Sequence, residues 1–467
     1  MKASRCLYFL VGLNLIFIIA GTSTLAGVKV FITSGRLTIE ASGVPLRDIL
    51  TRINDQGVGI KIGPDINPLV TASFANESIT AGLDRILGSL NHALIWDQVE
   101  GPLGPIPRLA EIQIFEAGAR QAMAPLEHRP RFELARNSAN GAAYVRNEIL
   151  IGLGKEMDAA KFHLLLEKIG GTVLGSHGAT GIYRIRMGGD QDIPDLADRL
   201  NALEGVDRAE PNWAYRLPTR QALTAPAGDG TGPDAQLAGD NGIPIAVLDS
   251  GLQSTAQLDA LTIASLDALA PGTPISDTLG HGTQMALVAS GSVTPWNAES
   301  PTEGEGNPII AVRAFDDSGV TSNFALMESV DFALAQGAKV MSLSWGTETP
   351  SQFLENTMNY GHSQGLIIVA AAGNKPTGKP YYPAAYPAII GVGALDETGR
   401  PWEKSNYGDF VTLSASGIAT LPVGHQGDPG VYTGTSIATA FVANLIAQAL
   451  AADPDADIAA ILAGIEQ

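Results

Sequence analysis

Three polar residues at widely separated positions have the side chains needed for nucleophilic catalysis. Asp249 follows a short apolar run in "IAVLDSG", His281 lies between two glycines in "LGHGTQMALVAS", and Ser436 begins a long apolar stretch in "YTGTSIATAF". Serine becomes a strong nucleophile only when a base accepts its proton, and that base needs a carboxylate that orients it. If the three side chains meet in space, they could cleave an ester or an amide.

Each of these residues also has an ordinary structural explanation. An aspartate after a strand commonly forms a turn, a histidine at a helix start commonly packs or caps, and a serine there is a common N-cap. A fourth residue favours the catalytic interpretation, because Asn374 follows another apolar run in "VAAAGN". A side-chain amide at that place could donate a hydrogen bond to the oxyanion that forms during acyl transfer.

The segments around these residues alternate between apolar strands and helices. Five short apolar runs without polar alternation predict parallel strands covered on both faces: "IPIAVLD", "IIAVRAF", "KVMSLSW", "LIIVAAAG" and "AIIGVGAL". Helical stretches such as "NFALMESVDFALAQGA" lie between them. We therefore predict an α/β fold with a doubly wound, mainly parallel sheet over residues 236–467, preceded by two small α+β domains. In such sheets, functional side chains gather at the carboxyl ends of the strands.

Residues 236–467 resemble the subtilisin-like serine proteases along their whole length. The segments "DSG", "HGT", "AAGN" and "GTSIA" match that family's motifs in order and spacing. The resemblance implies that Asp249 orients the imidazole, that His281 is the general base and then the acid, and that Ser436 is the nucleophile. It also implies that Asn374 and the backbone N–H of Ser436 bind the oxyanion. The expected activity is that of a serine endopeptidase working through an acyl-enzyme intermediate.

The resemblance also implies a substrate-binding region beside the nucleophile. Ser344, Trp345 and Gly346 match the segment that pairs with the substrate backbone and forms one wall of the primary specificity pocket. Ala372 and Gly373 match the opposite wall. Trp345 stands where a smaller apolar residue is usual, and its indole could either pack in the core or contact the substrate.

A smaller unit precedes this region. Strand and helix patterns alternate over residues 141–217, from "EILIGL" through "DAAKFHLLLEKIGG" and "GIYRIRM" to "IPDLADRLNALEGV" and "DRAEPNWAYRL". The segments "VRNEILIGL" and "GVDRAEPNWAYRL" are similar to the propeptide of subtilisin-like proteases. This similarity implies a zymogen inhibited by its own propeptide. Residues 218–235, rich in Pro, Gly, Thr and Ala, form the expected linker with the processing site.

A further lobe is expected over residues 28–97, where two strand–helix patterns follow each other. Its segments "ASGVPLRDIL" and "ESITAGLDRIL" resemble the short N-terminal domain of secretins and TonB-dependent receptors. That resemblance implies a periplasmic setting and contact with an envelope protein, and a generic α/β lobe is the alternative. Pro/Gly punctuation and a polar, arginine-rich stretch predict a linker over residues 98–140.

The N-terminus indicates export. Residues 1–26 combine a positively charged start, an apolar run over residues 7–20 and a small-residue end, a pattern typical of a secretory signal peptide. The apolar run is short for a membrane span, although retention as an anchor is the alternative. We therefore expect a periplasmic or extracellular protein that acts on polypeptide substrates.

Composition narrows the partners and cofactors. The formal net charge of −19 argues against nucleic acid, and from Gln236 onward 6 Lys/Arg stand against 23 Asp/Glu. Cys6, in the expected signal peptide, is the only cysteine, so the mature chain would have no disulfide. We expect no cofactor and no metal, because acidic residues such as Asp259 and Asp316 are expected to be solvated; structural calcium is the alternative, but no pattern indicates it.

Two other functions could use the same residues. In one, the chain is a catalytically inactive envelope protein-binding module on a protease scaffold, but the intact Asp, His, Ser and Asn argue against this. In the other, the same three side chains serve an esterase or acyltransferase. Labelling of Ser436 by a fluorophosphonate separates an active centre from an inactive scaffold, and comparison of peptide with simple ester turnover separates the two enzyme classes.

Overall fold

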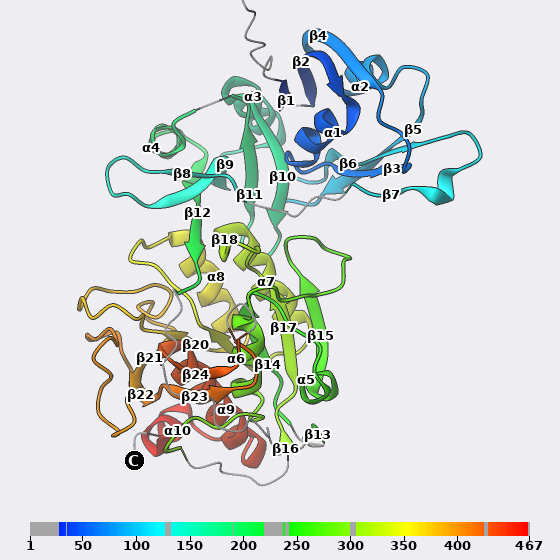
Figure 1. The fold of residues 1–467 in the computed structure, drawn as a ribbon. Coiled ribbons are helices and arrows are strands. Elements are labelled where there is room, and N and C mark those ends of the chain that lie inside the picture. Colours follow the sequence, from blue (N-terminus) through cyan, green and yellow to red (C-terminus); the bar gives the residue numbers. More distant parts are fainter. Residues whose placement is uncertain are drawn as a thin grey trace, which may run out of the picture.

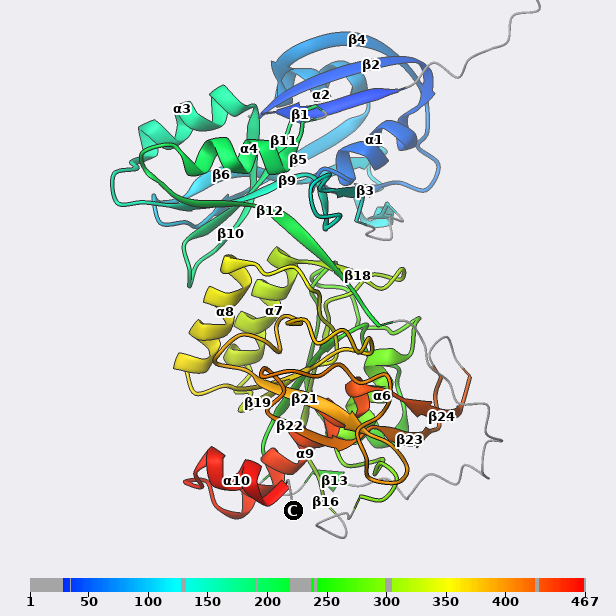
Figure 2. The same cartoon turned by 90° about the vertical axis from the view of Figure 1, so that its left-hand side faces the viewer.

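The structure is a computed structural model that describes residues 28–33, 35–126, 132–189, 191–218, 237–238, 242–298, 305–424 and 428–465. The expected signal peptide, and the expected processing linker beyond residue 218, lie outside the described residues. Figures 1 and 2 show the chain in two halves, with the strand β12 (Val206–Arg216) running from the upper half into the lower one. The upper half holds an N-terminal lobe (residues 28–126) and a middle unit (residues 132–218), and the lower half is the C-terminal unit (residues 237–465).

The C-terminal unit is built on a seven-stranded sheet in which every pairing is parallel. This arrangement confirms the predicted doubly wound α/β fold. The strand order is β15-β17-β14-β19-β20-β21-β22, and each of the five apolar runs contains one of these strands. Their bounds are β14 (Ile245–Asp249), β15 (Thr262–Asp267), β17 (Ile309–Arg313), β19 (Val340–Leu343), β20 (Ile367–Ala371), β21 (Ile390–Leu395) and β22 (Leu413–Ser416).

Helices cover both faces of this sheet, because successive side chains of a strand point to opposite faces. On one face, α6 (His281–Ala289) and α9 (Thr435–Ala452) pack in a core that includes Ile245 and Val247. On the other, α7 (Asn323–Ala335) and α8 (Gln352–Ser363) pack around Ala246 and Leu248. The other elements of the unit are α5 (Ala256–Leu261), α10 (Ile458–Ile465), β13 (Leu237–Ala238), β16 (Glu305–Gly306), β18 (Val320–Ser322), β23 (Ile418–Leu421) and β24 (Gly430–Thr433).

The apolar helix α9 is a core helix. Within the described part of the chain it is the one helix long and apolar enough to span a membrane by length and composition. Its 18-residue apolar window is 72% buried inside the protein, and its first residues, Thr435 and Ser436, are buried as well. Ser436, in the first turn of this helix, is therefore buried inside the C-terminal unit.

The middle unit is an antiparallel sheet of order β10-β11-β9-β12, with two helices packed on one face. The sequence patterns predict every element of this unit except β8 and β10. The strand β12 continues beyond the unit and pairs antiparallel with β18 of the C-terminal unit. The bounds are β8 (Leu134–Arg136), β9 (Ala143–Leu153), α3 (Ala159–Ile169), β10 (Gly171–His177), β11 (Ile182–Met187) and α4 (Ile193–Asn201).

The N-terminal lobe contains two small sheets around one core, with strand orders β1-β2-β4 and β5-β6-β3-β7. Two amphipathic helices complete it, and the side chain of Ser78 caps the second. The bounds are β1 (Lys29–Thr33), β2 (Arg36–Pro45), α1 (Leu46–Asn54), β3 (Gly59–Ile62), β4 (Leu69–Ser78), α2 (Ile79–Leu87), β5 (Asn91–Val99), β6 (Ile106–Phe115), the 3-10 helix η1 (Arg120–Ala122) and β7 (Ala124–Pro125).

The linker predicted over residues 98–140 is wrong for much of its length. The strand β6 pairs with both β5 and β3, and its residues Leu109, Ile112 and Ile114 are buried in the lobe core. The backbone of β6 pairs with β3, and its alternating apolar residues pack in the core. The segment therefore forms a strand despite the nearby prolines and glycines. Further along, β8 belongs to the middle unit, where it pairs with β9.

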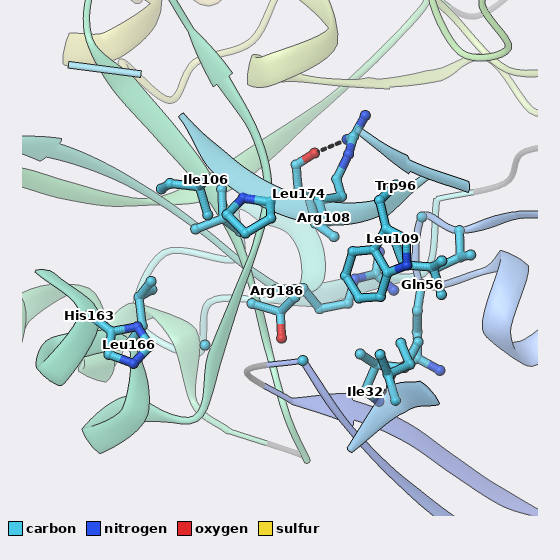
Figure 3. Close-up of a pocket in the computed structure, with 18 of the residues that line it drawn as sticks. Ile32, Gln56, Trp96, Ile106, Arg108, Leu109, His163, Leu166, Leu174 and Arg186 are labelled. Atoms are coloured by element: carbon cyan, nitrogen blue, oxygen red, sulfur yellow. Dashed lines mark hydrogen bonds between the residues drawn. The ribbon is translucent and has the colours of Figure 1, made fainter. Parts of the chain in front are cut away.

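A cavity of about 310 Å³ lies where the N-terminal lobe meets the middle unit (Figure 3). Two arginines cross this boundary beside it. Arg108 is paired with Asp97 and donates a hydrogen bond to the carbonyl of Leu174 in β10, and Arg186 of β11 donates to the carbonyl of Asp55 at 2.7 Å. The cavity thus lies at the interface between the N-terminal lobe and the middle unit, away from the sheet edge that carries the predicted catalytic residues.

Candidate active site

Asp249 and His281 meet at the carboxyl end of a central strand. Asp249 is the last residue of β14 and His281 is the first residue of α6. Both are buried, and His281 Nδ1 lies 2.7 Å from Asp249 Oδ1. The same carboxylate oxygen accepts the backbone N–H of Ser250 at 2.7 Å, which fixes its orientation. A carboxylate bound to Nδ1 favours the tautomer in which Nε2 is the basic nitrogen.

A second buried carboxylate, Asp277, holds the start of α6. It accepts hydrogen bonds from two backbone N–H groups just before the helix and from the N–H and hydroxyl of Thr283, at 2.7–3.1 Å. These bonds satisfy donors that a helix start leaves unpaired. Asp277 stands in none of the sequence motifs named above, and its place four residues before His281 is the only pattern that could have indicated this role.

Gly282 lets α6 approach the turn that follows β14. A Cβ at this position would lie 2.8 Å from the backbone nitrogen of Gly251, closer than side-chain atoms pack. Ser250 Oγ accepts the N–H of Gly282 at 2.8 Å. The glycine after His281 is therefore required for the backbone contact that brings the imidazole to Asp249.

The electrostatic surroundings favour the protonated form of His281. Burial alone would lower the pKa of the imidazole, but the charge and hydrogen bond of Asp249, helped by the charge of Asp277, raise it above its ordinary value of 6.5. An imidazolium that forms here during a reaction would be stabilised by two buried carboxylates.

Ser436 lies at the start of α9, against the segment that follows β19. Its Oγ donates to the carbonyl of Ser344 at 3.3 Å, and Ser344 Oγ donates to the carbonyl of Ser436 at 3.2 Å. Asn374, three residues after β20, accepts the N–H of Thr435 at 3.0 Å and its hydroxyl at 2.9 Å through Oδ1. Because Thr435 holds that oxygen, the NH₂ group is the end of the amide that can donate to another molecule. The four residues therefore lie at the carboxyl edge of one parallel sheet.

The segment after β19 binds a strand of the middle unit. Arg216 forms an antiparallel bridge with Gly346. On its other side, the same strand pairs with β18, and Leu217 continues this pairing by donating its N–H to the carbonyl of Gly319 at 3.0 Å. Gly346, which is predicted to pair with the substrate backbone, thus pairs with the chain's own backbone. Figure 2 shows β12 running down beside β18.

The indole of Trp345 both packs in the core and contacts this strand. It is 1% exposed, and its Nε1 donates to the carbonyl of Leu248 at 3.1 Å. Its ring lies 5.7 Å from that of Tyr215 and 5.9 Å from that of Phe315, centroid to centroid. The hydroxyl of Tyr215 donates to Asn323. An aromatic side chain of β12 therefore packs against Trp345 in the core of the C-terminal unit.

Two polar residues of β12 bind the N-termini of α8 and α7. Glu210 accepts the hydroxyl of Ser351 at 2.7 Å and the N–H of Gln352 at 3.0 Å. Asn212 accepts the N–H of Phe324 at 3.1 Å. Acceptors at a helix start satisfy unpaired N–H groups, and a carboxylate also interacts favourably with the helix dipole. The "AEPN" segment thus docks the middle unit onto the two helices that face it.

The acidic residues considered as metal ligands differ from each other. Asp259 is exposed, as expected, whereas the expectation for Asp316 is wrong because it is buried. Asp316 Oδ1 accepts hydrogen bonds from Ser318 and from the N–H of Val320, so the carboxylate shapes the turn before β18. Over the described ranges, no group of three or more His, Cys, Asp or Glu is arranged to hold a metal ion.

Two family models match this chain. Residues 240–463 match the model of the Subtilase family, and residues 132–212 match that of the Fervidolysin N-terminal prodomain. A thermophilic serine proteinase of Bacillus sp. (strain AK1) is 29% identical over 317 residues, which are 65% of this chain and 78% of that protein. Thermitase of Thermoactinomyces vulgaris is 32% identical over 213 residues, 45% of this chain and 75% of thermitase.

The fold is also found in a solved structure. Fervidolysin from Fervidobacterium pennivorans, a keratinolytic enzyme related to subtilisin, is 22% identical with a TM-score of 0.54, and the likeness covers 71% of this chain and 58% of that one. The C-terminal unit therefore has a subtilisin-like α/β fold, and the middle unit corresponds to a prodomain. Neither of the two matched family models covers the N-terminal lobe.

Proposed function

Because this chain belongs to the subtilase family of serine-type endopeptidases, we propose that Asp249, His281 and Ser436 form its catalytic triad. The observation that carries the proposal is the buried 2.7 Å contact between Asp249 Oδ1 and His281 Nδ1. It supplies an oriented base at the sheet edge where Ser436 lies in the first turn of α9. A serine nucleophile requires this arrangement of base and carboxylate.

In the proposed reaction, the Ser436 hydroxyl turns from the Ser344 carbonyl toward His281 and attacks the peptide carbonyl. His281 takes the hydroxyl proton and then gives it to the leaving amine, while Asp249 stabilises the imidazolium. The NH₂ group of Asn374 and the Ser436 N–H would bind the oxyanion, and the loss of one such donor typically lowers kcat by about 10²–10³. Water then hydrolyses the acyl-enzyme by the same steps.

We also propose that the middle unit inhibits the enzyme until it is cut away. Its strand lies where an extended substrate would pair, with Arg216 on Gly346 and Leu217 on Gly319. A strand that adds to β18 excludes another peptide from the same backbone groups. Cleavage in the linker over residues 218–235 would free this edge, so the chain is a zymogen that processes itself.

Self-processing is tested by comparing the wild-type chain with a Ser436→Ala variant, both purified from the same host. The wild type should convert to a shorter active form that binds a fluorophosphonate at Ser436, while the variant should stay full length. Identical cutting of both proteins would contradict self-processing. Absence of an adduct on processed wild-type protein would favour the inactive envelope-binding scaffold instead.

We propose export for the whole protein. The N-terminal pattern of residues 1–26 supports this location, and one relative, the minor extracellular protease Epr of Bacillus subtilis, is extracellular by name. The N-terminal lobe, which resembles the short domain of secretins and TonB-dependent receptors, is proposed to contact an envelope protein. Mass spectrometry of both termini of the mature protein tests removal of residues 1–26, and retention of Met1 on membrane-associated protein would instead indicate an anchor.

A further inference from the structure

Two backbone segments flank Ser436 and define a gap beside it. Segment 344–346 is joined to Ser436 through the Ser344 carbonyl. Segment 372–374 ends at Asn374, which binds the residue before Ser436. An extended peptide already lies along Gly346, because Arg216 bridges it. In a substrate bound the same way, the side chain next to the scissile carbonyl must therefore enter the gap between the two segments.

The ring of Tyr381 fills this gap. A Cβ placed on Gly346 would lie 2.7 Å from Tyr381 Cδ1, and a Cβ placed on Gly373 would lie 3.1 Å from Cδ1 and Cε1 of the same ring. These distances are shorter than ordinary van der Waals contact, so the ring packs directly on the glycine backbone on both sides. It takes the volume that two opposed glycines would otherwise leave to a substrate.

The surrounding backbone holds Tyr381 in this place. Tyr382 exchanges two hydrogen bonds with Thr347, at 2.7 and 2.8 Å, and the Tyr381 carbonyl accepts the N–H of Ala385 at 2.9 Å. Burial, with a further contribution from the charge of Glu348, raises the pKa of Tyr381 to about 12. The phenol therefore stays neutral at neutral and mildly alkaline pH, and no ionisation expels the ring there.

We propose that Tyr381 closes the primary specificity pocket to large side chains, so that the enzyme, if it is the protease proposed above, cleaves after small residues such as glycine, alanine and serine. A rigid ring excludes a large side chain by overlap, which core packing tolerates poorly. The aromatic residue of the chain's own strand, Tyr215, packs against Trp345.

Fluorogenic peptides Tyr-Arg-Leu-X test the proposal, where the first three residues repeat residues 215–217 and X is alanine, leucine or phenylalanine. The processed protein, obtained by maturation of the full-length chain, is titrated with a fluorophosphonate, so that kcat/KM refers to active sites. For the wild type, kcat/KM should be at least about tenfold higher for alanine than for phenylalanine. Tyr381→Ala should raise the phenylalanine value at least about tenfold, and Tyr381→Phe, which keeps the ring, should preserve the wild-type order.

Two results would overturn the proposal: equal cleavage of the alanine and phenylalanine peptides by the wild type, or an unchanged preference in a fully labelled Tyr381→Ala enzyme. If Tyr381→Ala does not fold, the wild-type order and the Tyr381→Leu variant decide the question. A wild-type protein that neither binds the fluorophosphonate nor cleaves any peptide would contradict the protease function itself, and this proposal with it.

Discussion

The protonation state of His281 sets the acid limit of the proposed activity. Only the neutral imidazole can accept the Ser436 proton, and the carboxylates of Asp249 and Asp277 raise the pKa of His281 above 6.5 despite its burial. We therefore predict that kcat/KM rises with pH through an apparent pKa above 6.5. Asp249→Asn removes the main charge that raises the pKa of His281. The rise of kcat/KM with pH should therefore move to lower pH, while kcat falls by about 10⁴.

The pH profile is measured on processed enzyme with a neutral fluorogenic peptide. Asp259→Asn is a matched control, because Asp259 is an exposed carboxylate on the same unit and should leave the profile unchanged. An acid limb at or below 6.5 in the wild type would mean that Asp249 does not act on the titrating group.

The individual catalytic candidates could be predicted because each stands in a short motif at a strand or helix end. Residues that act from elsewhere in the chain could not. Tyr381 reaches the gap beside Gly373 only through the pairing of Tyr382 with Thr347, which is a long-range backbone contact. The burial of Asp316 likewise depends on the turn that it forms with Ser318 and not on its own sequence pattern.

The start of α8 provides a specific test of how the middle unit docks. Glu210 is the only side chain of that unit within the described residues that accepts from both Ser351 and Gln352. A hydrogen bond to a charged group contributes about 1.5–3 kcal/mol. Glu210→Ala should therefore weaken inhibition by the cleaved middle unit by about 10–100-fold, seen as a shorter lag before activity appears after processing. Glu204→Ala, at an exposed position of the same unit, should keep the wild-type lag, and equal lags in all three proteins would contradict the docking role.

Elements with strong periodicity are the ones that the sequence predicts well. The parallel strands of the C-terminal unit are continuous apolar runs, and α3 and α4 carry apolar residues at helical spacing with aspartate N-caps at Asp158 and Asp192. The sequence does not predict the strand β6, because Pro105 and Pro107 lie at its start. Its formation depends on pairing with β3 and β5. Pairing across the chain therefore limits the sequence prediction more than local propensity does.

The two halves of the molecule are joined by a network that begins at a fully buried carboxylate. Glu148 in β9 binds Arg184, Arg186 and Asn212 at 2.6–2.9 Å. Asn212 in turn accepts the N–H of Phe324 in α7, and the Arg184 guanidinium lies 5.5 Å from the centre of the Phe324 ring. The charge on Glu148 therefore supports both the fold of the middle unit and its contact with the C-terminal unit.

Acid should consequently loosen the whole zymogen through Glu148. Burial alone would raise its pKa, but the charges of Arg184 and Arg186 lower it from 4.5 to about 2. A lowered pKa stabilises the folded state above pH 4.5, and that stabilisation, about 3 kcal/mol, is lost as the pH falls from 4.5 toward 2. In full-length Ser436→Ala protein, added Glu148→Gln should lower the thermal midpoint of the middle unit at pH 7 and flatten its dependence on pH below 4.5. Glu156→Gln, at an exposed site, should keep the wild-type dependence, and a Glu148→Gln protein as stable as its parent at pH 7 would show that the network does not hold the halves together.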